Sequence, residues 1–187
     1  MDLTTTLISG LTSTAIRGLS QAEIQSLSTA EMASLQSSFV SYLTSTQVGY
    51  LETADLRLLT TSNLNLLGNS SQLPGLKAAQ VAALTSTQVE ALSTSFISAL
   101  SVEQLKNLSS SNVGALTTSN VVGLTTAQIA ALSNAQASKL TTAALNVLST
   151  DKFAALTAAQ LNGMTVTQWG GLSTTQLGAL SNAKLAT

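Results

Sequence analysis

The chain has 187 residues, a formal net charge of −1 and only 8% charged residues, so its composition gives no electrostatic basis for binding nucleic acid or an anionic membrane. Ser and Thr interrupt its apolar residues every few positions, and no stretch approaches the roughly 20 apolar residues of a membrane span. The absence of Cys and His excludes disulfide bonds, and without a cluster of metal ligands we expect no metal site and no cofactor.

A repeat of eight residues begins at Leu3 and continues through almost the whole chain. Position 1 of each octad is Leu, position 2 is Ser or Thr, and position 5 is mostly Gln, Asn, Glu, Asp or Lys. Position 6 is Ile, Val or Leu, and positions 4, 7 and 8 are mostly small. Since a fixed period dictates the architecture of a repeat protein, this octad determines the predicted fold.

Each octad carries the signals that start a helix. Ser or Thr at position 2 is a preferred N-cap, and Gln or Glu three residues later completes a capping box. The Leu before the cap and the apolar residue at position 6 occupy the two sites of a hydrophobic staple. The helix-cap residues predicted in this way include Ser20 with Glu23, Thr125 with Gln128, and Ser173 with Gln176.

The octad favours an all-α solenoid, a superhelix of very short capped helices with one helix per repeat. In one long helix, eight residues advance two turns plus about 80°, so the leucines would not share a face. A β-solenoid is the alternative, because an even period permits it. However, positions 1 and 6 would then point to opposite faces of a straight strand, whereas the step of three from position 6 to the next Leu suits a helical turn.

The first section, residues 3–67, is the less regular part of the solenoid. Leu7, Ala15 and Phe39 stand at position 5 in place of a polar residue, and Tyr42 and Tyr50 put bulk at position 8. These larger groups predict a wider or differently curved section, or a surface that meets another molecule.

Residues 68–75 form a Gly- and Pro-containing break that makes one unit nine residues long. Pro74 is the only proline, and it lacks a backbone N–H, so we expect Leu73-Pro74-Gly75 to be a turn that interrupts the stack. The break is either an insertion tolerated in a surface loop or a kink that marks a subdomain boundary.

From residue 76 to 187 the octad is regular, and we expect one domain that continues across the break. Its Leu and Ile/Val positions predict the core of the repeat, which includes Leu84, Val89, Leu92, Leu124, Ile129, Leu132, Leu172 and Leu177. An isolated octad is far too short for a stable helix, so stability must come from stacking on neighbours. Small residues at positions 4, 7 and 8 allow the close approach that stacking needs.

The ends of the repeat suggest self-association. A free-standing solenoid normally carries polar capping units, but the octad begins at Leu3 and is still running at Leu180. Open, complementary ends on one chain make a heterologous contact that produces filaments. We therefore expect the chain itself to be the partner, in a head-to-tail homopolymer.

The run Leu-Thr-Thr-Ala-Gln-Ile-Ala-Ala-Leu-Ser at 124–133 resembles the Leu-Ser/Thr-x-x-Gln-Ile/Val repeats of large bacterial surface and secreted proteins. The resemblance covers nearly the whole chain. It implies an extracellular structural or adhesive role, often with secretion that uses no N-terminal signal.

These observations predict a structural repeat protein that assembles end to end into an extracellular filament, matrix or adhesive fibre. The alternative is a binding module whose Thr/Ser ladders, such as Thr12-Ser-Thr14, Thr44-Ser-Thr46 and Thr85-Ser-Thr87, contact ice or a polysaccharide surface. Catalysis is not expected, because no Ser has a candidate base and no phosphate-binding loop is present. Residues 1–6 lack the features of a signal peptide, so we expect export by a route without such a signal, or a leader outside this sequence, with a cytoplasmic location as the alternative.

Overall fold

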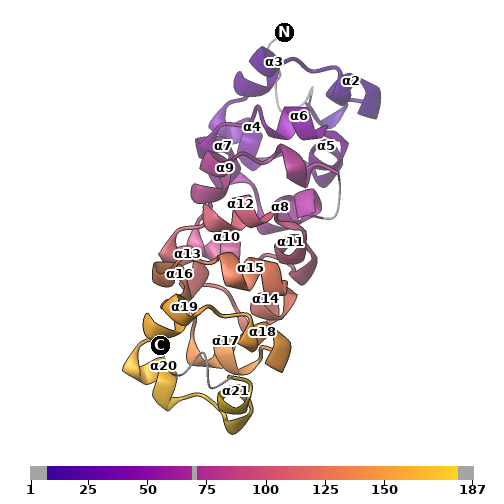
Figure 1. Cartoon of the computed structure of the whole chain (residues 1–187). Coiled ribbons are helices and arrows are strands. Elements are labelled where there is room, and N and C mark those ends of the chain that lie inside the picture. The colour runs from indigo at the N-terminus through magenta and orange to yellow at the C-terminus, as the bar shows by residue number, and fades with distance from the viewer. Residues whose placement is uncertain (1–7, 69–70, 181–187) are drawn as a thin grey trace.

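The computed structural model describes residues 8–68 and 71–180, and this part of the chain is a stack of short helices. It contains twenty α-helices of four to eight residues, one 3-10 helix and no strand within the described residues. The helices follow one another along a single long axis, from α2 at one end of the rod to α21 at the other (Figure 1). The predicted all-α solenoid is therefore confirmed, and the β-solenoid is not the fold.

Each octad from residue 11 to residue 179 contributes one helical segment. The segments are α2 (Ser13–Arg17), α3 (Gln21–Gln25), α4 (Thr29–Ala33), α5 (Ser37–Tyr42), α6 (Ser45–Val48), α7 (Thr53–Leu58), α8 (Thr61–Gly68), η1 (Leu73–Gly75), α9 (Ala78–Ala82), α10 (Ser86–Glu90), α11 (Thr94–Ala99), α12 (Val102–Lys106), α13 (Ser110–Gly114), α14 (Thr118–Gly123), α15 (Thr126–Ala131), α16 (Asn134–Ala137), α17 (Thr142–Asn146), α18 (Thr150–Ala154), α19 (Ala158–Asn162), α20 (Val166–Gly170) and α21 (Thr174–Gly178).

The helix α15 illustrates how an octad begins and ends a helix. Thr125 precedes it in an extended conformation, with φ −81° and ψ 162°, and its hydroxyl accepts from the backbone N–H of Gln128 at 3.2 Å. The side chain of Ile129 points into the core and is fully buried. Leu132 then returns to an extended conformation, with φ −58° and ψ 140°, so the next Ser is in place to cap α16. The octad is thus one helical turn followed by one extended corner.

Three to four octads make one turn of the superhelix. Helices three units apart along the chain pack against each other, as α5 packs on α8, α11 on α14 and α13 on α16. Polar side chains extend slightly further, to carbonyls 28 and 31 residues back along the chain. The turn therefore spans roughly 28 residues, which could not be predicted from the eight-residue period.

The Leu at position 1 and the apolar residue at position 6 build one continuous core. Of the predicted core residues, Val89, Leu124 and Ile129 are fully buried, and Leu84, Leu92 and Leu132 are each 4% exposed. In the last described turn the pattern changes, because Leu172 is only half-buried and Leu177 is 44% exposed instead of buried. In the interior of the rod a side chain at this position is covered by residues about 28 positions further along the chain. No described residue covers Leu177 in this way.

The break at residues 68–75 contains the expected turn, in the form of η1, but the stack is not interrupted there. Pro74 lies in the first turn of this 3-10 helix, where its missing N–H is not needed. η1 packs on α6, three units earlier, as the α-helices do. Gln72 donates to Val40 and Leu43, at 2.7 and 2.5 Å, so the contact between turns is kept in this unit.

Small residues occur where two turns approach most closely. A Cβ atom at Gly75 would lie 1.8 Å from the backbone oxygen of Ser45, and one at Gly123 would lie 2.8 Å from that of Thr94. A Cβ at Gly171 would meet the methyl group of Thr142 at 2.4 Å. These contacts join residues about 29 positions apart, so glycine at position 8 permits the stacking distance.

Candidate assembly interface

The residues at position 5 connect each turn of the superhelix to the turn before it. Gln128 is only 2% exposed, although its side chain is polar. Its Oε1 accepts from the backbone N–H of Thr125 at 2.7 Å, which completes the predicted capping box. Its Nε2 donates to the carbonyls of Ile97 and Leu100, at 2.9 and 2.7 Å, in the preceding turn. One amide therefore caps its own helix and also binds the neighbouring turn.

The same arrangement recurs along the rod, and we call it the amide ladder. Its members are the buried Gln residues at position 5, which each donate through Nε2 to one, two or three backbone carbonyls of the preceding turn. They are Gln47, Gln72, Gln80, Gln88, Gln104, Gln128, Gln136, Gln160, Gln168 and Gln176. Buried backbone carbonyls without a partner are costly, and the ladder gives the Leu carbonyls of the extended corners a donor. The position-6 carbonyls also accept from the N–H of the following Leu, as Ile97 does from Leu100.

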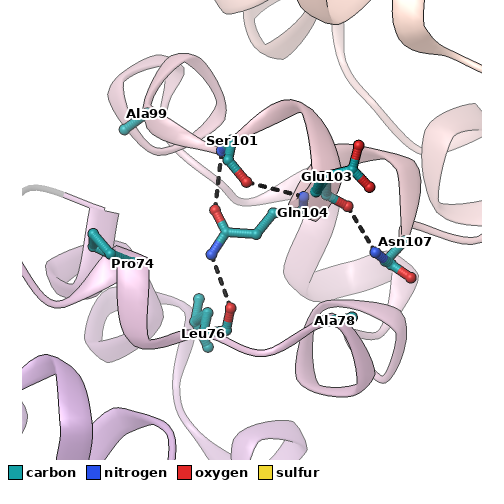
Figure 2. A pocket seen from close by; sticks show the side chains of 8 residues that line it. All are labelled: Pro74, Leu76, Ala78, Ala99, Ser101, Glu103, Gln104 and Asn107. Carbon is teal, nitrogen blue, oxygen red and sulfur yellow. Dashed lines mark hydrogen bonds between the residues drawn. The ribbon is translucent and has the colours of Figure 1, made fainter.

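Gln104 shows the ladder next to a surface groove of about 380 Å³ (Figure 2). Its Nε2 donates to Leu73 and Leu76, both at 2.9 Å, and its Oε1 accepts from the N–H of Ser101 at 2.9 Å. Asn107 donates to the carbonyl of Glu103 at 2.6 Å. The polar groups of the groove therefore hold the fold together, and their arrangement offers no nucleophile paired with a base.

Asn at position 5 performs the same role over a shorter reach. Asn63, Asn112 and Asn120 each donate to the single Leu carbonyl 28 residues earlier, at 2.7, 2.7 and 2.5 Å. Lys152 donates through Nζ to Val122, 30 residues earlier, at 2.6 Å. Different side chains thus keep one feature in common, a nitrogen donor directed at the preceding turn.

The amide ladder gives each turn two different faces. The face toward the N-terminus presents side-chain N–H donors, and the face toward the C-terminus presents backbone carbonyl acceptors. Side chains outside position 5 also bond in the opposite direction, since Asn65 and Asn146 donate to Ala91 and Gly171 of the following turn, both at 2.8 Å. The amide ladder itself points one way along the rod.

The helices α2 to α4 carry no amide at position 5. Ala15 is exposed there, and Glu23 and Glu31 are partly exposed. Glu23 accepts from the backbone N–H of Ser20 at 2.9 Å and from its hydroxyl at 2.8 Å, so the predicted capping box is present. These bonds from Ser20 lower the pKa of Glu23, and the equivalent bonds from Ser28 lower the pKa of Glu31. Both carboxylates are ionised at neutral pH.

The last described turn, α18 to α21, carries exposed apolar groups. Leu177 is 44% exposed and Val166 is 89% exposed, and Trp169 and Met164 are only partly buried against the core. This is the least covered apolar area among the residues that the structure describes.

The predicted cap of α21 forms in a different way from the others. The hydroxyl of Ser173 accepts from the N–H of Gln176 at 3.3 Å, but the N–H of Ser173 donates to Asn146 at 3.0 Å. The Oε1 of Gln176 contacts the Ser173 hydroxyl. Asn65 similarly accepts from the N–H of Ser93, at 2.6 Å, where Phe96 occupies position 5. Asn at position 7 thus completes a cap one turn further along the chain, a role that our sequence reasoning did not foresee.

The Thr pairs that suggested a binding surface are partly engaged in the fold. Thr12, Thr44 and Thr85 are N-caps and accept from backbone N–H groups at 3.1 to 3.2 Å. Thr12 and Thr44 are nevertheless exposed, as is the second Thr of each pair, at positions 14, 46 and 87. These exposed Thr residues occur in only some of the octads, and they are the surface that remains for the ice or polysaccharide alternative.

The described residues hold no group of three potential metal ligands, and none of their helices is long and apolar enough to cross a membrane. The expectation that the chain is not an enzyme stays a prediction.

Comparison with known families matches residues 113–142 to the ALTTAQ repeat. No curated protein matches the chain. The matched segment lies in α13 to α17 and contains three position-5 amides, Asn120, Gln128 and Gln136. This part of the chain is therefore similar to a known repeat, and the chain is a repeat protein.

Proposed function

We propose that this chain is a structural rod of an extracellular fibre or cell surface, and that its copies join end to end at the turn of α18 to α21. The observation that carries the proposal is the amide ladder, in which the buried polar side chains of the repeat form hydrogen bonds between one turn and the next. A rod that is stable only through its neighbours suits a spacing or load-bearing role.

A second copy of the same chain is the occupant that we propose for the last turn. In the interior of the rod every such apolar face is covered by another octad turn, so the exposed area around Leu177 continues an interface that the molecule already uses. The net charge of −1 leaves little repulsion between copies. The extracellular placement rests on the resemblance of residues 124–133 to surface and secreted repeat proteins.

The oligomeric state of the full chain tests this proposal. Sedimentation at increasing concentration, with negative-stain electron microscopy, should detect rods joined at their ends. Leu177→Gln should weaken the association at least tenfold, whereas Val122→Gln, at a side chain of similar exposure (48%) in α14, should leave it unchanged. Circular dichroism of both variants checks that they fold. A strictly monomeric wild-type protein, or equal behaviour of the two variants, would contradict the proposal.

A further inference from the structure

We propose that a polar hollow beside the loop before η1 binds an acidic saccharide, with a sugar carboxylate on Arg17 and sugar hydroxyls on the serine side chains around it. The hollow has a volume of about 320 Å³, at the lower end of the range for small-ligand sites, and we call it the Arg17 hollow. The proposal does not depend on end-to-end assembly of the rod. Six of the seven lining residues are polar, and they come from three successive turns: Arg17, Ser41, Thr44, Ser45, Ser71 and Gln72.

The shortness of η1 opens the Arg17 hollow. In this unit a 3-10 helix of three residues stands where the other described units have an α-helix of four to eight residues. Fewer atoms therefore fill the space between the turns, and Ser71 and Gln72, which precede η1, form one wall of the hollow. The groove beside Gln104 borders the same unit through Pro74. Both cavities thus lie at the unit that departs from the octad.

Two rungs of the amide ladder hold the walls of the hollow in place. Gln47 donates to two backbone carbonyls that flank Arg17, at 2.8 and 2.9 Å. Gln72 donates to two backbone carbonyls that flank Ser41, at 2.7 and 2.5 Å. The backbone that carries these side chains is therefore fixed before a ligand binds, which reduces the entropic cost of binding.

Arg17 supplies the charge of the hollow, because the other lining residues are neutral. Its side chain is exposed, and the only ion pair within the described residues joins Lys106 to Glu103. A guanidinium group is always charged and can bind both oxygens of a carboxylate through two parallel N–H donors. A single cation balances one carboxylate, whereas a phosphate monoester carries about 1.5 to 2 negative charges at neutral pH. The charge of the hollow therefore favours a carboxylate.

The hydroxyl groups around Arg17 favour a sugar as the carrier of that carboxylate. The hydroxyls of Ser45 and Ser71 make no hydrogen bond within the described part of the chain, and each can both donate and accept, as sugar hydroxyls do. Ser41 donates to a backbone carbonyl at 2.9 Å and can still accept. No aromatic residue lines the hollow, so a nucleobase would have no stacking surface, and Leu43 is the only apolar lining residue. An acidic sugar combines the two groups that this lining recognises.

Isothermal titration calorimetry of the full chain with trigalacturonic acid tests the proposal, and galactotriose, which lacks the carboxylates, is the neutral comparison. Trigalacturonic acid should bind at least about fivefold more tightly than galactotriose. Arg17→Gln should lower the affinity for trigalacturonic acid at least about fivefold, because it removes the charged partner of the carboxylate. Arg57→Gln is the matched control, because Arg57 is exposed at position 7 of its octad, as Arg17 is, but does not line the hollow. This control should change the affinity by less than about twofold.

Ser45→Ala tests the sugar contacts separately from the charge. It should lower the affinity for trigalacturonic acid at least about twofold, through the loss of one hydroxyl partner, and circular dichroism checks that all three variants fold. Sodium sulfate serves as the probe for an anion without a sugar.

Selective weakening by Arg17→Gln and Ser45→Ala supports the site. Sulfate that binds as tightly as trigalacturonic acid, or an unchanged affinity in Ser45→Ala, would overturn the saccharide and leave a bare anion site. Equal losses in the two arginine variants would reveal a general effect of charge and overturn the site, as would a wild-type protein that binds no trigalacturonic acid. Equal binding of galactotriose would overturn the role of the carboxylate.

Discussion

At the scale of single residues, position 5 combines two tasks that local sequence patterns cannot separate. A capping box accepts Glu and Gln equally, because only a side-chain oxygen is needed. The contact between turns uses a donor, so Gln and Asn predominate at position 5 from Gln47 onward, although the buried Phe96 and Ala144 also occupy this position. This preference for amides over acids was the available signal for the ladder, and Asp55 is the exception to it.

Replacing Asp55 with Asn should stabilise the protein at neutral pH. By analogy with Asn63, the new amide would donate to the carbonyl 28 residues earlier, that of Leu27, and such a bond contributes about 0.5–1.5 kcal/mol. The folded-state pKa of Asp55 is raised, so the stability that its neutral form contributes is full below the unfolded-state pKa and is lost as the pH rises through the folded-state pKa.

Urea unfolding across the pH range measures this effect. The gain from Asp55→Asn should therefore be small in acid and should grow as the pH rises to neutral. Asp151→Asn, at an exposed carboxyl group outside position 5, serves as the control and should change the free energy of unfolding by less than about 0.5 kcal/mol. A gain that is equal at all pH values would refute the assignment to ionisation.

At the scale of elements, most helices have only four to six residues, with a side-chain cap at the start, and many end beside glycine or another small residue. The small residue matters because the next layer lies directly against it. η1 shows the limit of this tolerance, since an entire α-helical turn is replaced by a 3-10 turn while Gln72 keeps its place in the ladder. Local helix type is therefore less important than the positions of the corner and the amide.

Gly75→Ala should lower the free energy of unfolding by about 1–3 kcal/mol, because its Cβ would overlap the backbone of Ser45. Gly178→Ala is the matched control. No atom lies within 4 Å of its Cβ position, so the change should be neutral or should stabilise α21 by less than about 1 kcal/mol. Thermal unfolding followed by circular dichroism compares the two, and an equal effect would mean that close approach does not limit the stacking of η1 on α6.

At the scale of the whole molecule, the rod depends on the phase of the octad, that is, on which octad positions face each other in successive turns. It does not depend on the identity of any one unit. The nine-residue unit demonstrates this, since Gln80 reaches carbonyls 29 and 32 residues back, whereas Gln104 reaches 28 and 31. Both sets of carbonyls belong to positions 6 and 1 of their octads. The ladder thus survives a change in chain length, provided that the phase is kept.

Deleting residues 132–139, one complete octad, should therefore leave the helical content per residue unchanged and reduce the melting temperature only slightly. Deleting residues 132–135 alone should place several units out of phase with the preceding turn. The loss of several kcal/mol should reduce the melting temperature by about 10–20 °C, because each kcal/mol of stability corresponds to a few °C. Circular dichroism melts measure both. Similar losses in the two deletions would show that unit identity, and not phase, determines the stack.

The sequence by itself determined the helix class, the unit length, the caps and the core positions, because all of these depend on contacts within one octad or between adjacent ones. Only the tertiary structure decided the number of octads per turn and the hydrogen bonds from Gln128 and its equivalents to the preceding turn. It also decided the caps that Asn65 and Asn146 complete for helices of the following turn. These features join residues about 28 positions apart, and an eight-residue period states nothing about which unit lies on which. The exposure of Leu177 is of the same kind, since Leu177 occupies the same octad position as the buried Ile129 and only the neighbouring turn distinguishes them.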